Sequence, residues 1–211
     1  MSHPPGLRER KKIRTRNALV DASLRLFEEK GYDATTIAEI AAAVDVSPRT
    51  FFSYFTSKED VVFFDNEVRV AEALRVIADR RPGESAMDLL VRAARQSLDR
   101  DFADADRSVE AAQRRTHLIE SVPSLQARAL HLLFDTQRRV ARALHEACPD
   151  QLDPVEAASA VGAIVGAARL AAMTCVDQGA SPPEVRAAID KAIDITIRGL
   201  GSFGFPGHDA R

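Results

Sequence analysis

The stretch TIAEIAAAVDVSPRTFFSYF, residues 36–55, contains two helix starts separated by a short break. Thr36 and Glu39 form a capping-box pair, in which a hydroxyl and a carboxylate each satisfy a backbone amide at a helix start. Ser47 followed by Pro48 is the favoured order of N-cap and first helical residue. Two short helices joined by a tight turn predict a helix-turn-helix.

The second helix of this pair has one clearly apolar face. Phe51 and Phe55 lie four residues apart, so they share that face. They are expected to pack on the first helix, against Ile37, Ile40 and Ala41. This packing would leave the other side chains of the second helix directed outward.

Those outward side chains have the chemistry that reads duplex DNA. An arginine can donate two hydrogen bonds to the edge of a guanine, and a methyl or phenyl group can contact the methyl group of thymine. Hydroxyl and lysine groups can bind phosphates. No acid occurs from residue 46 to residue 58, where each uncompensated carboxylate would repel the DNA backbone. The same spacing would also fit an ordinary helical hairpin that is basic but does not bind DNA. The predicted DNA-binding residues are Thr35, Thr36, Ser47, Arg49, Thr50, Phe52, Ser53, Tyr54 and Lys58.

Charge is distributed unevenly along the chain. The 211 residues have a net charge of −2, but the first sixteen contain six cations and one acid. Such a basic end is expected either to meet a polyanion or to be a solvated tail. The composition, 45% hydrophobic and 28% charged, predicts a soluble globular protein. No apolar run follows the basic residues, so we expect no secretory signal, a cytoplasmic location and reduced cysteines.

Residues that typically start or end helices recur along the whole chain, and no series of strands and turns is seen. This pattern predicts an all-α fold of about nine helices. Gly31 is a suitable residue to end the first helix. Asp153 and Ser181 each precede a proline and have an acid three residues later, which predicts two more helix starts. The other predicted helices span residues 8–30, 36–43, 47–55, 57–79, 85–101, 106–120 and 123–148.

The sequence carries no recognisable catalytic motif. It contains no G-x-S-x-G, no glycine-rich phosphate loop and no H-E-x-x-H. His131 and His145 are separated by fourteen helical residues, about 21 Å by helix rise, and could not share a metal. We therefore expect no enzyme, no cofactor and no metal site. The rival class is a helical adaptor, or a small-molecule binding protein without DNA binding, but it leaves the basic helix-turn-helix unexplained.

Three runs of sequence resemble the TetR/AcrR family of bacterial one-component regulators: LFEEKGY at 26–32, TTIAEIA at 35–41 and VSPRTFFSYFTSKE at 46–59. The resemblance covers roughly residues 10–62. It implies a transcriptional regulator that binds a palindromic operator as a homodimer. The family usually has glycine at the position of Arg49, so this chain adds a long side chain that can reach bases.

The resemblance also implies an organisation and an effector. It implies a DNA-binding domain over 1–56, an effector-binding and dimerisation domain over 57–204 and a flexible tail over 205–211. PRTFF and SKEDV look like actinobacterial regulators related to the mycofactocin-system repressor, which implies a repressor released by a small apolar or acyl-type ligand, such as an acyl-CoA or a fatty acid. The predicted ligand-binding residues are Phe63, Phe64, Leu89, His117, Leu118, Phe134, Arg169 and Met173. Arg169 would meet an anionic head group or an acid on a neighbouring helix, and His117 would line the pocket or be a hydrogen-bonded core residue.

Residues 157–176 are mostly apolar and long enough to span a bilayer, but Arg169 and the many alanines and glycines argue against a membrane span. Gly162 and Gly166 instead allow another helix to approach closely, within the same chain or from a second one. In the family the last two long helices form a four-helix dimer interface. The predicted interface residues are Gly162, Gly166, Ile189, Ile193 and Ile197.

Overall fold

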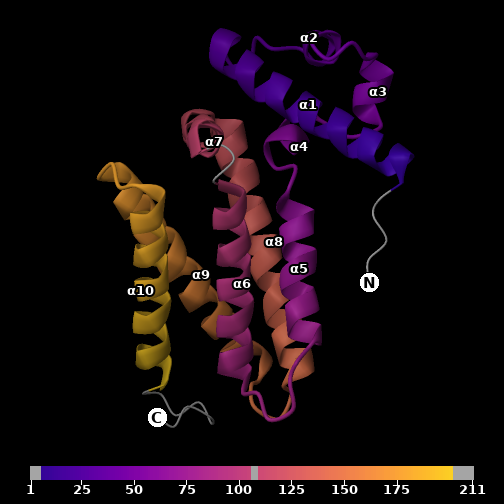
Figure 1. Cartoon of the computed structure of the whole chain (residues 1–211). Helices are drawn as coiled ribbons and strands as arrows, with labels where there is room; N and C mark the ends of the chain where they lie inside the picture. The colour runs from indigo at the N-terminus through magenta and orange to yellow at the C-terminus, as the bar shows by residue number, and fades with distance from the viewer. Residues whose placement is uncertain (1–5, 106–108, 202–211) are drawn as a thin grey trace. The chain divides into compact units, whose positions relative to one another are not determined.

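The computed structural model describes residues 6–105 and 109–201, and every regular element in these ranges is an α-helix (Figure 1). The all-α prediction is confirmed, with ten helices in the described ranges in place of about nine. The predicted tail over 205–211 lies outside these ranges. The helices are α1 (Leu7–Lys30), α2 (Ile37–Ala42), α3 (Pro48–Phe52), α4 (Lys58–Val62), α5 (Asn66–Ala78), α6 (Ala86–Ala105), α7 (Val109–Ser121), α8 (Pro123–Ala147), α9 (Pro154–Asp177) and α10 (Pro182–Gly201).

The predicted single helix over 57–79 is wrong, because residues Phe63–Asp65 separate α4 from α5. The Arg16 guanidinium lies 5.4 Å from the centre of the Phe55 ring and 5.3 Å from that of Phe64, and it donates to the Phe64 carbonyl. Arg115 lies over the Phe64 ring and pairs with the Asp65 carboxylate at 3.2 Å. Contacts from α1 and α7 therefore occupy the backbone and side chains at the break. Neither glycine nor proline marks it in the sequence.

The described chain divides into two compact units. The first contains the residues up to Asn66 together with Glu110–His131, and the second contains Glu67–Val109 and the residues from Leu132 onward. In the first unit α1 contacts both α2 and α4, and α2 contacts α3 (Figure 1). Its buried core is formed by Leu19, Val20, Leu26, Phe27, Tyr32, Ile40, Ala41, Phe51, Phe55, Val61, Val62 and Leu125.

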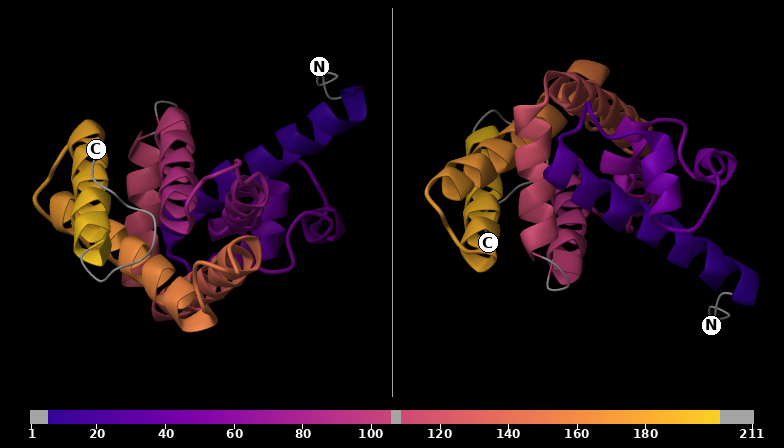
Figure 2. Two further views of the ribbon diagram at one scale, coloured as in Figure 1. Left: turned by 90° about the horizontal axis from the view of Figure 1, so that it is seen from below. Right: turned by 90° about the horizontal axis from the view of Figure 1, so that it is seen from above.

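In the second unit α9 and α10 lie side by side, and both contact α6 (Figure 2). Both predicted helix starts are confirmed: Asp153 and Glu156 form a full capping box, and Ser181 donates to Glu184. The largest fully buried side chains of this unit include Ile77, Leu89, Leu144, Ile164 and Ile193.

A largely buried ion pair closes the loop before α6. Arg92 Nε donates to Glu84 Oε1 at 2.6 Å, with both side chains less than 15% exposed. The hydrogen bond from Arg92 lowers the pKa of Glu84 to about 2, against a usual value of 4.5. Because the pKa is depressed in the folded chain, the stabilisation is present above the unfolded value and is lost as pH falls from about 4.5 toward 2.

Glu84→Gln should therefore lower the free energy of unfolding at pH 7 by about 3 kcal/mol at most, the equivalent of the shift in pKa. The variant should also lose less stability than the parent between pH 4.5 and pH 2. Urea denaturation across this pH range measures both effects. Glu29→Gln, in an exposed pair with Arg25, is the control. An unchanged acid dependence in Glu84→Gln would contradict the assignment.

Candidate nucleic-acid interface

The short helix α3 is held from its start and from one face. Ser47 Oγ accepts a hydrogen bond from Thr50 N at 3.1 Å, which caps the helix as predicted. The Phe51 side chain is fully buried and Phe55 is 4% exposed, in one cluster with α2. The predicted packing of the two helices is confirmed.

The turn between α2 and α3 is equally defined. The backbone amide of Val46 donates to the carbonyl of Ala41 at 3.0 Å. Asp45 has a φ of 53°, in the left-handed region that few residues other than glycine adopt. The turn therefore fixes the orientation of α3 against α2.

The exposed side of α3 presents one cation and one aromatic ring. Arg49 and Ser53 are exposed, and Phe52 is 54% exposed although it is a large apolar residue. The Phe52 ring stands edge-on to Phe51, with 5.7 Å between ring centres. Thr50 and Tyr54 are half-buried. An exposed guanidinium beside an exposed ring has the chemistry to contact guanine edges and thymine methyl groups.

The hydroxyl groups at this face are already used by the helix itself. Ser47 Oγ and Thr50 Oγ1 lie 2.9 Å apart and share a hydrogen bond. Ser53 Oγ donates to the Thr50 carbonyl at 2.6 Å. Thr36 is exposed and completes the capping box of α2 with Glu39. These hydroxyls are therefore pre-oriented, and each retains at most part of its hydrogen-bonding capacity for a phosphate.

Thr35 has a different place from the one predicted. Its side chain is 1% exposed, and its Oγ1 lies within hydrogen-bonding distance of the carbonyls of Gly31, at 2.9 Å, and Leu26, at 3.1 Å. The hydroxyl thus satisfies carbonyls at the end of α1. We correct its assignment from an exposed DNA contact to a residue that fixes the connection between α1 and α2.

Lys58 is also more constrained than its sequence position suggests. Its Nζ donates to the carbonyls of Tyr32, at 2.9 Å, and Thr35, at 3.0 Å, and lies 4.5 Å from the centre of the Tyr32 ring. The Tyr32 hydroxyl donates to Glu59 at 2.7 Å, and burial raises the pKa of this phenol. The ammonium group therefore joins α4 to the end of α1, with one N–H left for an outside acceptor.

Two acids of α2 and of the turn that follows it lie near this face in sequence: Asp45 is exposed, whereas Glu39 is paired with Lys30. Glu39 accepts a hydrogen bond from Lys30 at 2.6 Å, and this contact lowers the pKa of the exposed Glu39 carboxyl to about 2. The carboxylate also accepts from the backbone amide of Thr36 at 2.9 Å. Its charge is thus paired at the start of α2, which lessens its repulsion of a bound polyanion.

The predicted ligand-binding residues fall into both units. Phe63, Phe64, His117 and Leu118 belong to the first unit, where His117 is exposed and the other three pack at its core. Leu89, Phe134, Arg169 and Met173 belong to the second unit. Leu89 is fully buried, whereas Phe134 is 57% and Met173 42% exposed and Arg169 is exposed. The structure does not bring Leu89 onto a common surface with the other three.

The predicted interface residues also separate into two groups. A side-chain carbon added at Gly162 or Gly166 would meet nothing within 4 Å in one chain, so the helix surface beside them is open. Ile193 and Ile197, in contrast, are 1% and 9% exposed in the core of the second unit, and Ile189 packs against that core. We correct these isoleucines from a dimer surface to the interior of the single chain.

An apolar surface that was not predicted from the sequence lies on the same helix as the glycines. Leu170 and Met173 follow Gly162 and Gly166 on one face of α9, and Leu170 is 66% exposed. Although α9 is long and apolar enough to cross a membrane, with a mean hydropathy of 1.6, only 17% of its most apolar window is buried. The four-residue spacing that continues from the glycines could have indicated this face. The other exposed apolar residues of α9 and α10 are Val155, Val176 and Ile195.

Comparison with known proteins matches two parts of the chain to family models. A family model described as "Bacterial regulatory proteins, tetR family" matches residues 19–63, and one described as "MftR C-terminal domain" matches residues 84–201. The HTH-type transcriptional regulator TcmR of Streptomyces glaucescens is 38% identical over 143 residues, which are 65% of this chain and 62% of TcmR. HbdR of Aromatoleum sp. is 40% identical over 48 residues, 23% of this chain and 21% of HbdR. The matched part is thus less than two thirds of either relative's length.

Solved structures share the fold at low identity. SmeT, the repressor of the Stenotrophomonas maltophilia multidrug efflux pump SmeDEF, has a TM-score of 0.57 at 18% identity, over 87% of this chain and 89% of SmeT. Thermus thermophilus FadR in complex with lauroyl-CoA has a TM-score of 0.53 at 19% identity, over 92% of this chain and 100% of FadR. A further structure is that of SmeT with triclosan, with a TM-score of 0.56 at 18% identity, over 88% of this chain and 90% of that one.

Lys58→Met should lower the free energy of unfolding by about 1 to 3 kcal/mol, because the half-buried carbonyls of Tyr32 and Thr35 would lose their donor. Lys30→Met is the matched control, since its ammonium pairs with an exposed carboxylate and such pairs contribute about 1 kcal/mol or less. Chemical denaturation of both variants measures the difference. Equal losses would show that the Lys58 ammonium is an ordinary surface cation.

Proposed function

Since the chain belongs to the TetR family of bacterial regulatory proteins, we propose that it represses transcription by binding a palindromic operator as a homodimer. A small apolar or acyl-type effector releases it. The DNA-binding domain is residues 1–56, the effector-binding and dimerisation domain is residues 57–204, and the protein acts in the cytoplasm. The observation that carries the DNA-binding part is the exposed pair Arg49 and Phe52 on a helix that is fixed by a fully buried neighbour.

In this proposal α3 enters the major groove and its exposed residues read bases. Arg49 forks onto a guanine, and Phe52 packs on a thymine methyl group. Ser47, Thr50, Ser53, Tyr54 and Thr36 contact the phosphates on either side, and Lys58 supplies its remaining N–H. The absence of acids from 46 to 58 keeps this surface attractive to the backbone.

Arg49→Ala should weaken binding to the selected operator by about 1 to 3 kcal/mol and relax the preference at one base pair of each half-site. Operators selected from random duplexes, followed by gel shifts at fixed salt, measure the loss. Arg25→Ala, which removes an exposed arginine of α1, should leave both affinity and preference near the parent values. Equal losses on selected and scrambled duplexes would reduce Arg49 to a phosphate contact. Failure of the parent to bind any duplex would favour the adaptor or binding-protein class.

A second copy of the chain is the occupant proposed for the apolar face of α9. Leu170, Met173 and the open surface at Gly162 and Gly166 form one stripe, and small residues in it allow close approach of a second helix. Ile195 of α10 is 54% exposed and extends the apolar area to the helix that packs beside α9. The long stem of Arg169 can cover apolar surface while its charge reaches the rim. A two-fold dimer through α9 and α10 then sets two α3 helices on inverted half-sites.

Leu170→Glu should give a monomer with parental helical circular dichroism and poor operator binding, because it places a charge in the dimer seam. Gly166→Leu should act in the same way by filling the open surface. Leu130→Glu alters another exposed leucine, in α8 and 52% exposed, and should remain dimeric. Native mass spectrometry distinguishes the states. A dimer that persists in Leu170→Glu would move the interface away from α9.

The effector-binding role rests on family membership and on relatives of the same fold. SmeT is described with triclosan and FadR with lauroyl-CoA, both of which have large apolar parts. In this chain the predicted pocket residues are Phe63, Phe64, Leu89, His117, Leu118, Phe134, Arg169 and Met173. Arg169 has no ion pair among the described residues, which favours a role with an anionic ligand over a bridge within the chain.

Lauroyl-CoA added to a preformed complex of protein and operator should lower the operator affinity by up to about 150-fold, the equivalent of about 3 kcal/mol of coupling. By linkage, operator DNA should weaken the binding of lauroyl-CoA by the same factor. Lauric acid tests whether the acyl chain alone is sufficient. Tight binding of lauroyl-CoA without any change in operator affinity would exclude it as the effector.

A further inference from the structure

The first turns of α1 form a helical projection with cations over more than half of its circumference. Arg8, Arg10, Lys11, Lys12 and Arg14 are all exposed. Glu9 and Ile13 occupy the remaining side by helical spacing, and Ile13 is 46% exposed. We name residues 8–14 the basic arm. Among the described side chains of α1 the buried positions begin at Leu19, so the described residues of the arm make little use of the core of their own unit. In Figures 1 and 2 this end of α1 projects beyond α2, α3 and α4.

The arm is helical in spite of several unfavourable electrostatic terms. Arg8 with Lys11 and Lys12, and Arg10 with Arg14, are like charges at spacings of three or four residues, which repel on a helix surface. The cations also occupy the first turns, at the positive end of the helix dipole. Gly6 at the N-cap has no side chain to satisfy the free amides.

Several arginines elsewhere in the described chain have acidic partners. Arg92 pairs with Glu84, Arg95 with Asp194, Arg128 with Asp60, and Arg139 with Glu67. No ion pair of the five basic-arm cations is found among the described residues. The arm thus has five cations against one acid, Glu9, in its sequence, and an anion from outside the chain would relieve the repulsion among the cations.

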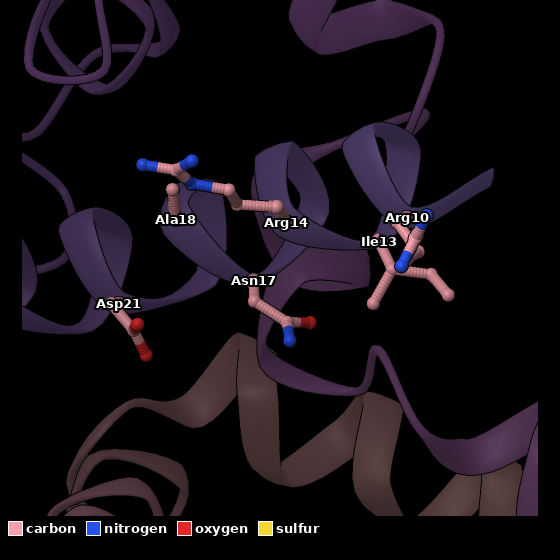
Figure 3. A pocket seen from close by; sticks show the side chains of 6 residues that line it. All are labelled: Arg10, Ile13, Arg14, Asn17, Ala18 and Asp21. Atoms are coloured by element: carbon pink, nitrogen blue, oxygen red, sulfur yellow. The ribbon is translucent and has the colours of Figure 1, made fainter. Parts of the chain in front are cut away.

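The surface beside the arm does not suit a compact anion or a membrane. The pocket on this part of α1 is lined by Arg10, Ile13, Arg14, Asn17, Ala18 and Asp21, so its lining includes a carboxylate, and Figure 3 shows these side chains extending from a single helix. A helix that lies on a lipid surface needs a broad apolar face, whereas the arm offers Ile13 alone. Cations along one broad side of a helix match an extended, regularly charged polyanion better than either.

We propose that the basic arm binds the phosphate backbone of duplex DNA in the flank of each half-site, beyond the base pairs read by α3. The inference rests on the proposed function, because α3 brings the arm to the duplex. Arm and α3 belong to the same compact unit, so a duplex held by one is within reach of the other. Seven helical residues extend the unit by about 10 Å, and a duplex presents a charge about every 1.7 Å along its axis. Several flanking phosphates are therefore available to each arm.

The test compares two duplexes with the same operator, one ending at the outer edges of the half-sites and one extended by about one helical turn on each side. The full-length protein carries Lys11→Gln with Lys12→Gln, and the control carries Arg138→Gln with Arg142→Gln, which removes the same charge from exposed residues of α8. Affinity is measured at several salt concentrations for the selected and a scrambled sequence.

On the extended duplex the arm variant should lose roughly fivefold in affinity at 0.15 M salt for each phosphate contact removed, and its salt slope should fall by about 0.9 per contact. Its preference for the selected over the scrambled sequence should be unchanged. On the short duplex it should bind like the control. Tighter binding of the parent to the extended duplex than to the short one would add support.

The proposal would be overturned if the arm variant and the control variant bound the extended duplex with equal affinity. It would also be overturned if the arm variant lost the same factor in affinity on both duplexes. Vesicles of anionic phospholipid test a membrane as the alternative partner of the arm. If Lys11 and Lys12 were needed for binding to these vesicles but not for binding to DNA, the proposal would also be overturned. If the parent does not discriminate the selected sequence even on the short duplex, the proposed operator-binding function fails independently of the arm.

Discussion

A helix of five residues cannot hold its own position in water, so the placement of α3 depends on the burial of Phe51. This ring is fully buried with Ile40 and Ala41 of α2, and the Ser47 cap fixes the start of the helix. Once Phe51 points inward, helical geometry directs Arg49 and Phe52 outward. The exposed guanidinium and ring thus result from one packing contact.

Contacts made by residues near α3 fix its position relative to α1 and α4 of the first unit. The ammonium of Lys58 joins the start of α4 to the end of α1, and the Arg16 guanidinium stacks between Phe55 and Phe64 at the break before α5. The side chains that follow α3 are therefore tied to α1. A change at the helix break that reached Phe55 would act directly beside the residues that hold α3.

Local signals in the sequence were sufficient for most of the helices and for the core of the helix-turn-helix. Capping residues such as Thr36 and Asp153 act on neighbouring amides, and Phe51 and Phe55 share a face at any orientation of the helix. What the sequence could not decide was which neighbour covers a given face. The isoleucines of α10 have the period of an interface, but α9 of the same chain covers them, and Leu170 is left exposed in their place. Thr35 was misplaced for the same reason, and the acceptors of Lys58 could not be predicted, because both side chains bond to carbonyls of residues that the fold alone brings near. The break at Phe63–Asp65 depends on Arg16 and Arg115, far away in sequence, and has no local mark.

Photo-crosslinking from the exposed ring of α3 tests the central claim most directly. The protein with p-benzoylphenylalanine in place of Phe52 is bound to its selected operator and irradiated, with the same group in place of Leu130 as a control. The account predicts crosslinks to bases inside both half-sites, removed by unlabelled operator and not by a scrambled duplex, and none from position 130. Operator binding without crosslinks from position 52, or crosslinks spread evenly along the duplex, would contradict the assignment of α3 as the helix that reads DNA.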